Sequence, residues 1–367
     1  MIKQLMLLSA ICAASGVFAS AYSDAYSAAG KEEKAKKYEV AAISYVAAAD
    51  VADKPGEKAN AYFRAAECMR IKKDYPASMD FLKKMLAVKG ASPYYRGLAQ
   101  MRIGQTLYWQ RKYAEAIPEL QKAVAIEKIH PHHKADALMY IGYGNYNLKK
   151  YEDAFKTMDK VVADEQARPD QRSAAQLYKG HSLKNQKKYA EAIAEYKKVA
   201  TIDKAHPAHV LDSRRQIGYV LNSMKKPDEA TKVLKEIVAD PKADSNNKAY
   251  ALIAIGNVLR GQKKNDEAIV EYKKVLDLPK LHPHRKGEAL WLIGYTLRSQ
   301  KKYEESNKAL AECVAIKGGH YYFTSVSQMY IGHNLRSLKK FPEAIAAFEK
   351  VKTLKQYHPH HISDADR

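Results

Sequence analysis

Apolar residues recur at helical spacing along the chain, in short runs separated by polar turns. In one run Ala137, Leu138, Ile141 and Leu148 fall on one face of a helix, and the polar turn Lys149-Lys150 follows directly. A second apolar run of similar length comes after the turn. The hydrophobic pattern therefore predicts pairs of amphipathic helices joined by short turns.

The pairs return with a fixed period of 38 residues, which a series of glycines marks without an insertion. Ala66 holds the same place one period before the first of these glycines, and Ala29 stands 37 residues before Ala66. A constant period of this length is typical of stacked helical units, so we expect about nine copies. The glycines are Gly104, Gly142, Gly180, Gly218, Gly256, Gly294 and Gly332.

Each glycine falls inside a predicted helix, where it costs about 1 kcal/mol relative to alanine. A repeated cost of this kind indicates that the second helix of the pair crosses close to the glycine. A small residue follows twelve positions later, and a large apolar residue follows sixteen positions later. The small residues are Ala116, Ala154, Ala192, Ala230, Ala268, Ser306 and Ala344, and the large ones are Leu120, Met158, Tyr196, Leu234, Tyr272, Leu310 and Phe348.

This combination resembles the tetratricopeptide repeat, over about residues 22–360. The resemblance implies an all-α, right-handed superhelical solenoid of about nine helix-turn-helix repeats, whose concave face holds a protein partner. Two features depart from the family. The period is 38 rather than about 34 residues, and valine mostly replaces the small residue after the aromatic one, at Val161, Val199, Val275 and Val351.

The first 21 residues have the pattern of a secretory signal, which predicts an exported bacterial protein in the periplasm or secreted from the cell. Lys3 precedes an apolar run from Leu5 to Ala14, and small residues at Ala19 and Ala21 fit a cleavage site. An uncleaved membrane anchor is the alternative. We place the solenoid at 22–361 and a tail at 362–367, with repeats at about 22–55, 56–92, 93–130, 131–168, 169–206, 207–244, 245–282, 283–320 and 321–358.

The resemblance also implies which side chains face a partner, namely those one, four and five residues after each glycine. Tyrosine, tryptophan, arginine and asparagine are frequent at these positions, as on recognition surfaces. An arginine ladder in the last three copies favours an acidic partner. The predicted contact residues are Tyr108, Trp109, Tyr143, Asn147, His181, Asn185, Tyr219, Asn222, Asn257, Arg260, Tyr295, Arg298, His333 and Arg336.

Positive charge is in large excess, with a formal net charge of +21, and much of it lies in the turns inside the pairs. Stacking would align these turns in a basic ridge. An alternative function is therefore binding of an anionic envelope polymer, either an acidic polysaccharide or lipid headgroups, although such turns also serve solubility. The ridge residues are Lys149, Lys150, Lys187, Lys188, Lys225, Lys226, Lys263, Lys264, Lys301, Lys302, Lys339 and Lys340.

Histidine and proline recur at every second boundary between repeats, as in His130-Pro131 and His282-Pro283. Proline suits the first turn of a helix, and we interpret the preceding histidine as a helix cap. Metal binding is the other hypothesis, because histidine and aspartate one turn apart can chelate zinc. The weak candidates for it are His130, His133, Asp136, His206, His209 and Asp212.

Catalytic, phosphate-loop, dinucleotide and nucleic-acid motifs are absent from the sequence. We therefore expect no enzyme activity, no cofactor and no nucleic acid, and no membrane span beyond the signal. Cys68 and Cys313 lie many repeats apart, so we expect two buried thiols rather than a disulfide. The sequence predicts a non-enzymatic scaffold of the cell envelope that binds a protein segment, with the polyanion and metal hypotheses as alternatives.

Overall fold

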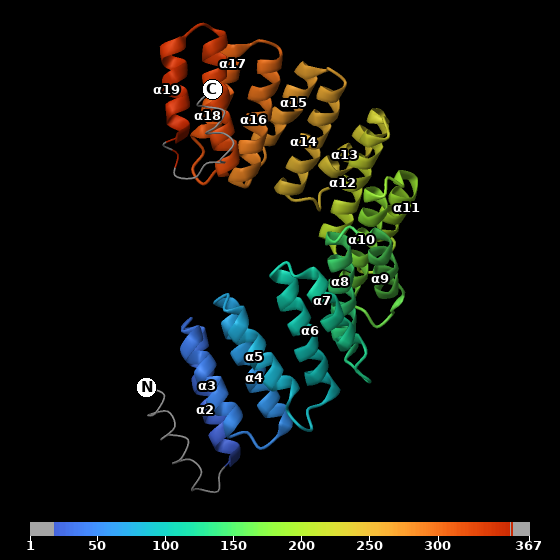
Figure 1. The fold of residues 1–367 in the computed structure, drawn as a ribbon. Coiled ribbons are helices and arrows are strands. Elements are labelled where there is room, and N and C mark those ends of the chain that lie inside the picture. Colours follow the sequence, from blue (N-terminus) through green and yellow to red (C-terminus); the bar gives the residue numbers. More distant parts are fainter. Residues whose placement is uncertain (1–17, 353, 355–367) are drawn as a thin grey trace. The chain divides into compact units, whose positions relative to one another are not determined.

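The computed structural model describes residues 18–352 and residue 354, and the regular structure in this part of the chain is entirely helical (Figure 1). The all-α helix-turn-helix fold predicted from the sequence is confirmed. The helices are α2 (Phe18–Lys34), α3 (Tyr38–Asp50), α4 (Pro55–Ile71), α5 (Tyr75–Leu86), α6 (Pro93–Trp109), α7 (Tyr113–Val124), α8 (Pro131–Asn147), α9 (Tyr151–Ala163), α10 (Pro169–Asn185), α11 (Tyr189–Val199), α12 (Pro207–Ser223), α13 (Pro227–Ala239), α14 (Ser245–Gly261), α15 (Asn265–Leu276), α16 (Pro283–Ser299), α17 (Tyr303–Val314), α18 (Tyr321–Ser337) and α19 (Phe341–Lys352).

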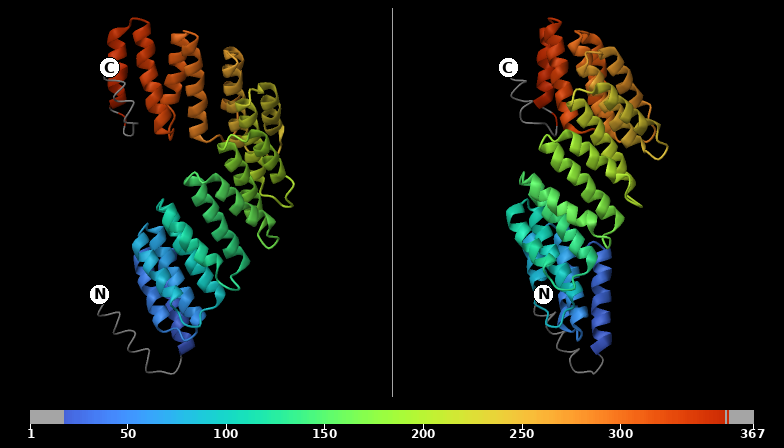
Figure 2. Two further views of the ribbon diagram at one scale, coloured as in Figure 1. Left: turned by 45° about the vertical axis from the view of Figure 1, so that its right-hand side comes forward. Right: turned by 90° about the vertical axis from the view of Figure 1, so that its right-hand side faces the viewer.

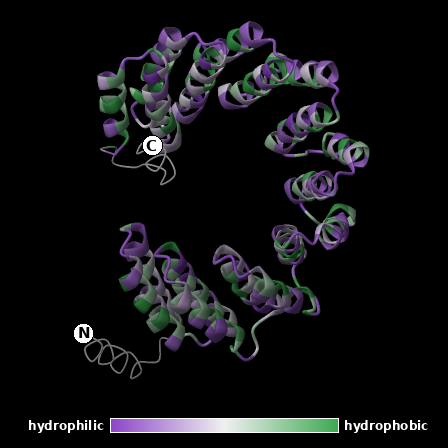
Figure 3. Ribbon diagram, turned by 45° about the horizontal axis from the view of Figure 1, so that its top comes forward, coloured by the Kyte–Doolittle hydropathy of each residue, from purple (hydrophilic) through white to green (hydrophobic). Residues whose placement is uncertain are grey.

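The chain divides into two compact units. Unit 1 comprises the described residues up to Lys188 together with Lys198–His206, and unit 2 comprises Tyr189–Lys197 and the described residues from Pro207 onward. Within each unit an even-numbered first helix pairs with the odd-numbered second helix that follows, and successive first helices also touch (Figure 2). Every helix carries both hydrophilic and hydrophobic residues, as expected where one face is buried (Figure 3).

The repeated glycines lie where the two helices of a pair cross, as the spacing predicted. A Cβ atom added at Gly218 would lie 2.8 Å from Cγ of Leu234, and one at Gly256 would lie 2.3 Å from Cε1 of Tyr272. Both partners are fully buried. The residue sixteen positions later therefore occupies the space that the missing side chain leaves, and the same relation holds for the other glycines for which contacts are described, Gly104, Gly142, Gly294 and Gly332.

The small residue twelve positions after the glycine lies in the same crossing. Where it is serine, the hydroxyl also satisfies a backbone acceptor: Ser306 donates to the Gly294 carbonyl at 2.7 Å, and Ser78 donates to the Ala66 carbonyl at 2.9 Å. These contacts show why alanine or serine suits this position, since a larger side chain would separate the helices.

The turn inside each pair is a left-handed helix cap formed by a basic residue. Lys225 has a φ of 62°, its N–H donates to the Asn222 carbonyl, and the next N–H, of Lys226, donates to the Leu221 carbonyl. Glycine is the usual residue at such a position. The residues with this conformation are Lys36, Lys73, Arg111, Lys149, Lys187, Lys225, Lys263, Lys301 and Lys339, with φ between 60° and 63°.

Prolines open most first helices, as the sequence predicted. Pro131 and Pro283 occupy the first turns of α8 and α16, where a missing N–H costs little. The capping role of the preceding histidine is confirmed at His282, whose Nδ1 accepts the His284 N–H at 3.2 Å. His130 makes no side-chain capping bond, so the capping interpretation is wrong at that boundary.

The predicted signal at 1–21 and tail at 362–367 fall largely outside the described residues, and α2 begins at Phe18, inside the predicted signal. At the other end α19 leaves Phe341 and Ile345 more than half exposed, whereas Phe348 packs against Gly332. Cys68 and Cys313 are buried free thiols, as predicted. In the described part of the chain, no helix has the length and apolar character needed to cross a bilayer.

Candidate binding surface

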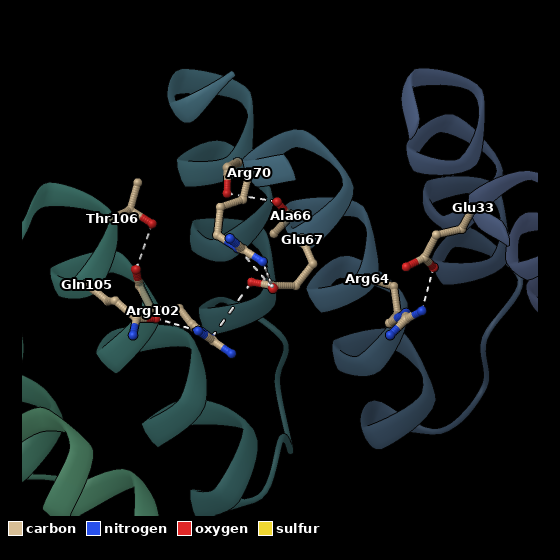
Figure 4. A network of polar contacts seen from close by, with 9 residues as sticks. Glu33, Arg64, Ala66, Glu67, Arg70, Arg102, Gln105 and Thr106 are labelled. Carbon is tan, nitrogen blue, oxygen red and sulfur yellow. Dashed lines mark hydrogen bonds and ion pairs between the residues drawn. The ribbon is translucent and has the colours of Figure 1, made fainter. Parts of the chain in front are cut away.

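The first helices of unit 1 present a joint surface, which we term the first-helix face. Its early part is an ionic network across α2, α4 and α6 (Figure 4). Arg64 pairs with Glu33 at 2.5 Å, Arg70 pairs with Glu67 at 2.9 Å, and Arg102 lies 3.8 Å from the same Glu67. Because the carboxylates are already paired with arginines, the charged side chains in this part of the face hold neighbouring first helices together.

Aromatic rings from α6, α8 and α10 continue the face. Tyr108 contacts Tyr140 and Tyr143, with ring centres 5.2 and 6.4 Å apart, and Tyr143 contacts Tyr178 at 4.4 Å. Burial raises the pKa of Tyr143, and its tyrosine neighbours raise it further. Trp109 lies under the guanidinium of Arg70, whose Cζ is 5.2 Å from the ring centre. The predicted residues Tyr108, Trp109 and Tyr143 thus belong to one cluster.

Two asparagines bind this cluster across the repeat boundary. Asn147 donates from Nδ2 to the Tyr108 hydroxyl at 3.1 Å, and Asn185 donates to the Tyr146 hydroxyl at 2.6 Å. Each pair spans 39 residues. We predicted Asn147 and Asn185 as partner contacts, but their side chains connect neighbouring first helices. His181 is half-buried and packs edge-to-face against Tyr178, with 5.1 Å between the ring centres.

In unit 2 one ring on α14 lies between two guanidiniums. The Cζ of Arg215 is 4.5 Å from the Tyr250 ring centre, and that of Arg285 is 3.8 Å from it. Arg285 also donates to the Tyr250 hydroxyl at 2.5 Å and pairs with Glu288. Burial raises the pKa of Glu288, against the opposing effect of Arg285. The sequence pattern did not indicate this group, because Arg215, Tyr250 and Arg285 all precede the glycine of their repeat, whereas the predicted contact positions follow it.

A second group in unit 2, termed the aromatic–arginine cluster, consists of Trp291, Tyr295, Tyr330, Arg260 and Arg298. The Tyr295 ring lies 5.7 Å from Trp291 and 5.8 Å from Tyr330. Arg260 lies over Tyr295 at 5.1 Å, and Arg298 lies over Tyr330 at 5.6 Å. Two arginines of the predicted ladder therefore bracket a row of rings.

The arginine ladder is less uniform than the sequence indicated. Arg260 and Arg298 are half-buried, and Arg298 also donates to Oδ1 of Asn334 at 2.6 Å. Arg336 is exposed. Two of the three guanidiniums are therefore partly covered, because aromatic rings on the neighbouring first helix lie against them.

Other predicted contact residues divide between the packed interior and the surface. Asn257 accepts a hydrogen bond from the Tyr272 hydroxyl at 2.8 Å, and His333 packs against Phe348 at 5.1 Å. Both therefore turn toward the second helix of their own pair. Tyr219 and Asn222 are exposed on α12.

The predicted ridge lysines are all exposed, and some are paired across turns. Lys226 lies 2.9 Å from Glu229, and Lys302 reaches Asp266 on the preceding pair at 3.5 Å. Ion pairs this exposed are weak and contribute little to stability. The lysine side chains can therefore exchange these partners for an anionic ligand.

In the described part of the chain, no group of three histidine, cysteine or acidic side chains is placed to hold a metal ion. Asp136 accepts from Gln171 Nε2 at 2.6 Å, and Asp212 accepts from Arg215 and Gln216. His133 is 8 % exposed, and burial, aided by nearby His130, lowers its pKa to about 4. His206 is exposed and His209 is half-buried.

Family models described as "Tetratricopeptide repeat" match four segments of the chain, residues 136–165, 175–206, 249–280 and 287–320. These four segments are tetratricopeptide repeats. Such repeats generally form non-enzymatic scaffolds for protein–protein interaction. A comparison with curated proteins found no match.

Solved structures, one of them of a tetratricopeptide repeat protein, have a similar fold. A tetratricopeptide repeat protein from Parabacteroides merdae ATCC 43184 is 14 % identical, with a TM-score of 0.52, over 76 % of this chain and 100 % of that one. The apo form of the quorum sensor NprR from B. thuringiensis is also 14 % identical, with a TM-score of 0.53, over 92 % of this chain and 98 % of that one. At this identity the similarity shows the fold alone.

Proposed function

We propose that this chain is an exported scaffold that binds an acidic segment of a protein partner on the surface that the first helices of unit 2 present. The observation that carries the proposal is the aromatic–arginine cluster. Arg260 and Arg298 are held over Tyr295 and Tyr330, so their guanidiniums are oriented before a partner arrives. Preoriented arginines lose less conformational entropy on binding than free lysines do, and they make paired hydrogen bonds with carboxylates.

The neighbouring exposed arginine extends this surface. Arg336 lies on α18, the helix that also carries Tyr330. Aromatic rings beside cationic groups form the kind of surface on which a few residues dominate binding energy. An acidic peptide that contacts all three arginines would therefore gain both charge-assisted bonds and apolar contact.

The test is capture of partners from an envelope extract by the immobilised mature protein, read out by mass spectrometry. A variant with Arg260→Lys and Arg336→Ala should lose the main partner while it keeps its helicity. Lysine at position 260 preserves the charge but not the planar fork of arginine, and alanine at position 336 removes the guanidinium. Its matched control changes Lys225, Lys226, Lys263 and Lys264 to Gln, and this control should retain capture at physiological salt. Loss of capture in the control alone would contradict the proposal.

A second candidate function is binding of an anionic envelope polymer by the lysine turns. It is favoured by the left-handed caps, in which a basic residue recurs at a conformation that glycine adopts at lower cost. Positive charge near a helix C-terminus also interacts favourably with the helix dipole, which offers a structural reason for the same residues. Retention on an acidic polysaccharide that falls steeply with added salt would support this function.

Export is part of the proposal, and the basis for it is the signal-like pattern of residues 1–21. Cleavage after Ala21 would retain Tyr22, whose hydroxyl donates to the Glu57 carbonyl at 3.3 Å, and Tyr26, which accepts from Asn60 at 2.9 Å. Amino-terminal sequencing of the protein from a periplasmic fraction tests this. A mature chain that begins at Met1 in the cytoplasm would contradict it.

A further inference from the structure

Unit 2 contains an open pocket of about 500 Å³ at the amino-terminal ends of α14, α16 and α18. Histidines and an arginine dominate its wall: His282, His284 and Arg285 come from the start of α16, and His320 comes from the start of α18. Asn246 and Tyr250 of α14 complete the side opposite α18. The pocket is separate from the aromatic–arginine cluster and from the lysine turns, which follow the other ends of the first helices.

Two consecutive glycines open this pocket. Gly318 and Gly319 stand where the preceding repeat has Lys280 and Leu281. A Cβ atom at Gly318 would have nothing within 4 Å, and Gly318 has a φ of +72°. Leu281 by contrast packs against the hydrophobic core of its own pair. At Gly319, which corresponds to Leu281, a Cβ atom would lie 3.1 Å from the Ile316 carbonyl oxygen, so the open space borders Gly318.

The histidines of the wall present donors. Nδ1 of His282 accepts the His284 N–H, and Nδ1 of His320 accepts the Tyr322 N–H, both at 3.2 Å. A neutral ring that accepts at Nδ1 carries its proton at Nε2, so both imidazoles retain an N–H donor. Asn246 uses its Oδ1 to accept the His282 N–H at 3.3 Å, which leaves its amide nitrogen as a further donor.

The charges at the pocket favour an anion. Among the described residues, no carboxylate lines it. Glu288, an acid close to the wall, pairs with Arg285 from within α16. The positive ends of two long helices, α16 and α18, also meet the wall. Burial, Arg285 and the neighbouring histidines together lower the pKa of His284, so cationic groups here repel one another until a counter-charge is present.

We propose that this pocket binds a phosphoryl group, as the free anion or as the phosphate monoester of a small polar molecule. Three imidazoles, an amide and a guanidinium supply enough donors for the three terminal oxygens of such a group, and phosphate is a common ligand of clustered cationic donors. The volume exceeds that of the phosphoryl group itself, so the pocket accommodates an ester. Tyr321, stacked on His320 with ring centres 4.7 Å apart, offers an aromatic wall to the rest of the ligand.

Titration calorimetry of the mature protein with glucose 6-phosphate, inorganic phosphate and glucose tests the proposal. Both phosphates should bind with millimolar or better affinity, and glucose alone should not. Equal affinity for the two phosphates would identify the free anion as the ligand, and tighter binding of the ester would identify a monoester.

The variant His282→Asn with His320→Asn isolates the imidazole donors. Asparagine preserves a side-chain acceptor at both helix caps, so folding is retained, while affinity should fall about tenfold or more through loss of the charge-assisted bonds. The matched control is His130→Asn, which changes the corresponding residue before α8 in unit 1 and should bind like the parent protein. Absence of saturable binding, or unchanged affinity in the double variant, would overturn the proposal.

Discussion

The side-chain amide of Asn185 donates a hydrogen bond to the hydroxyl of Tyr146, 39 residues earlier, with 2.6 Å between Nδ2 and the phenolic oxygen. The bond joins α10 to α8, and Asn147 repeats it with Tyr108 one repeat earlier, at 3.1 Å. A surface that the resemblance assigned to a partner is thus used partly to hold neighbouring repeats in register.

We predict that Tyr146→Phe and Asn185→Ala each lower the free energy of unfolding, and that their effects are coupled. A double-mutant cycle by urea denaturation should give a coupling energy of about 0.5–1 kcal/mol, the usual net contribution of such a bond. The matched pair Tyr108→Phe with Asn185→Ala lacks a shared bond and should be additive. Coupling of equal size in both cycles would show that the asparagine acts through something other than Tyr146.

Gly218→Ala should destabilise unit 2 by about 1–3 kcal/mol, because its Cβ would lie 2.8 Å from Cγ of Leu234 and overpack the crossing. Gly261→Ala is the control. A Cβ at Gly261 meets nothing within 4 Å, and alanine is the better helix former, so this variant should be neutral or more stable. Denaturation midpoints followed by circular dichroism decide between the two; equal midpoints would mean that the crossing tolerates the methyl group.

Lys225→Gly should raise the melting temperature. Lys225 has a φ of 62°, and relieving that conformation contributes about 1 kcal/mol. The adjacent Lys226 has a φ of −113° and pairs with Glu229, so Lys226→Gly should give no gain. Each variant removes one lysine, so comparing their melting temperatures by calorimetry separates backbone strain from charge. Similar shifts in both variants would assign the effect to charge.

Acid should destabilise unit 1 through His133. Its pKa is about 4 in the fold, below the ordinary value near 6.5, so its contribution to stability is complete above about pH 6.5 and is lost as pH falls toward 4. We expect His133→Gln to reduce the loss of unfolding free energy between about pH 7 and pH 5 by about 1 kcal/mol. An unchanged slope in His133→Gln would contradict the assignment.

The sequence predicted the scaffold well because its contacts recur. Gly218 and Leu234 are one of several copies of the same crossing, so their spacing alone indicated that the helices meet there. The same holds for Pro131 and Pro283 at helix starts. Periodic contacts depend on the backbone, and the backbone of each repeat is nearly the same.

The surface could not be predicted in the same way, because it depends on side-chain direction. Nothing in the spacing of Arg298 indicated that it would cover Tyr330 and bond to Asn334. A signal was nevertheless present. Positions two residues before each glycine, or before Ala66 in the copy that lacks it, include Arg64, Arg102, Tyr140 and Tyr330, which all lie in the networks described above.

The recurring His-Pro helix starts at Pro131, Pro207 and Pro283 have a consequence for inheritance. They stand 76 residues apart, and each opens a first helix after a histidine. A stretch of gene that encodes the residues between two such prolines begins and ends in the same structural context, so its gain or loss rejoins a turn to a matching helix. Array length can then change in whole steps of two repeats. Selection can thus alter the number of partner positions by duplication or deletion, without new substitutions inside a repeat.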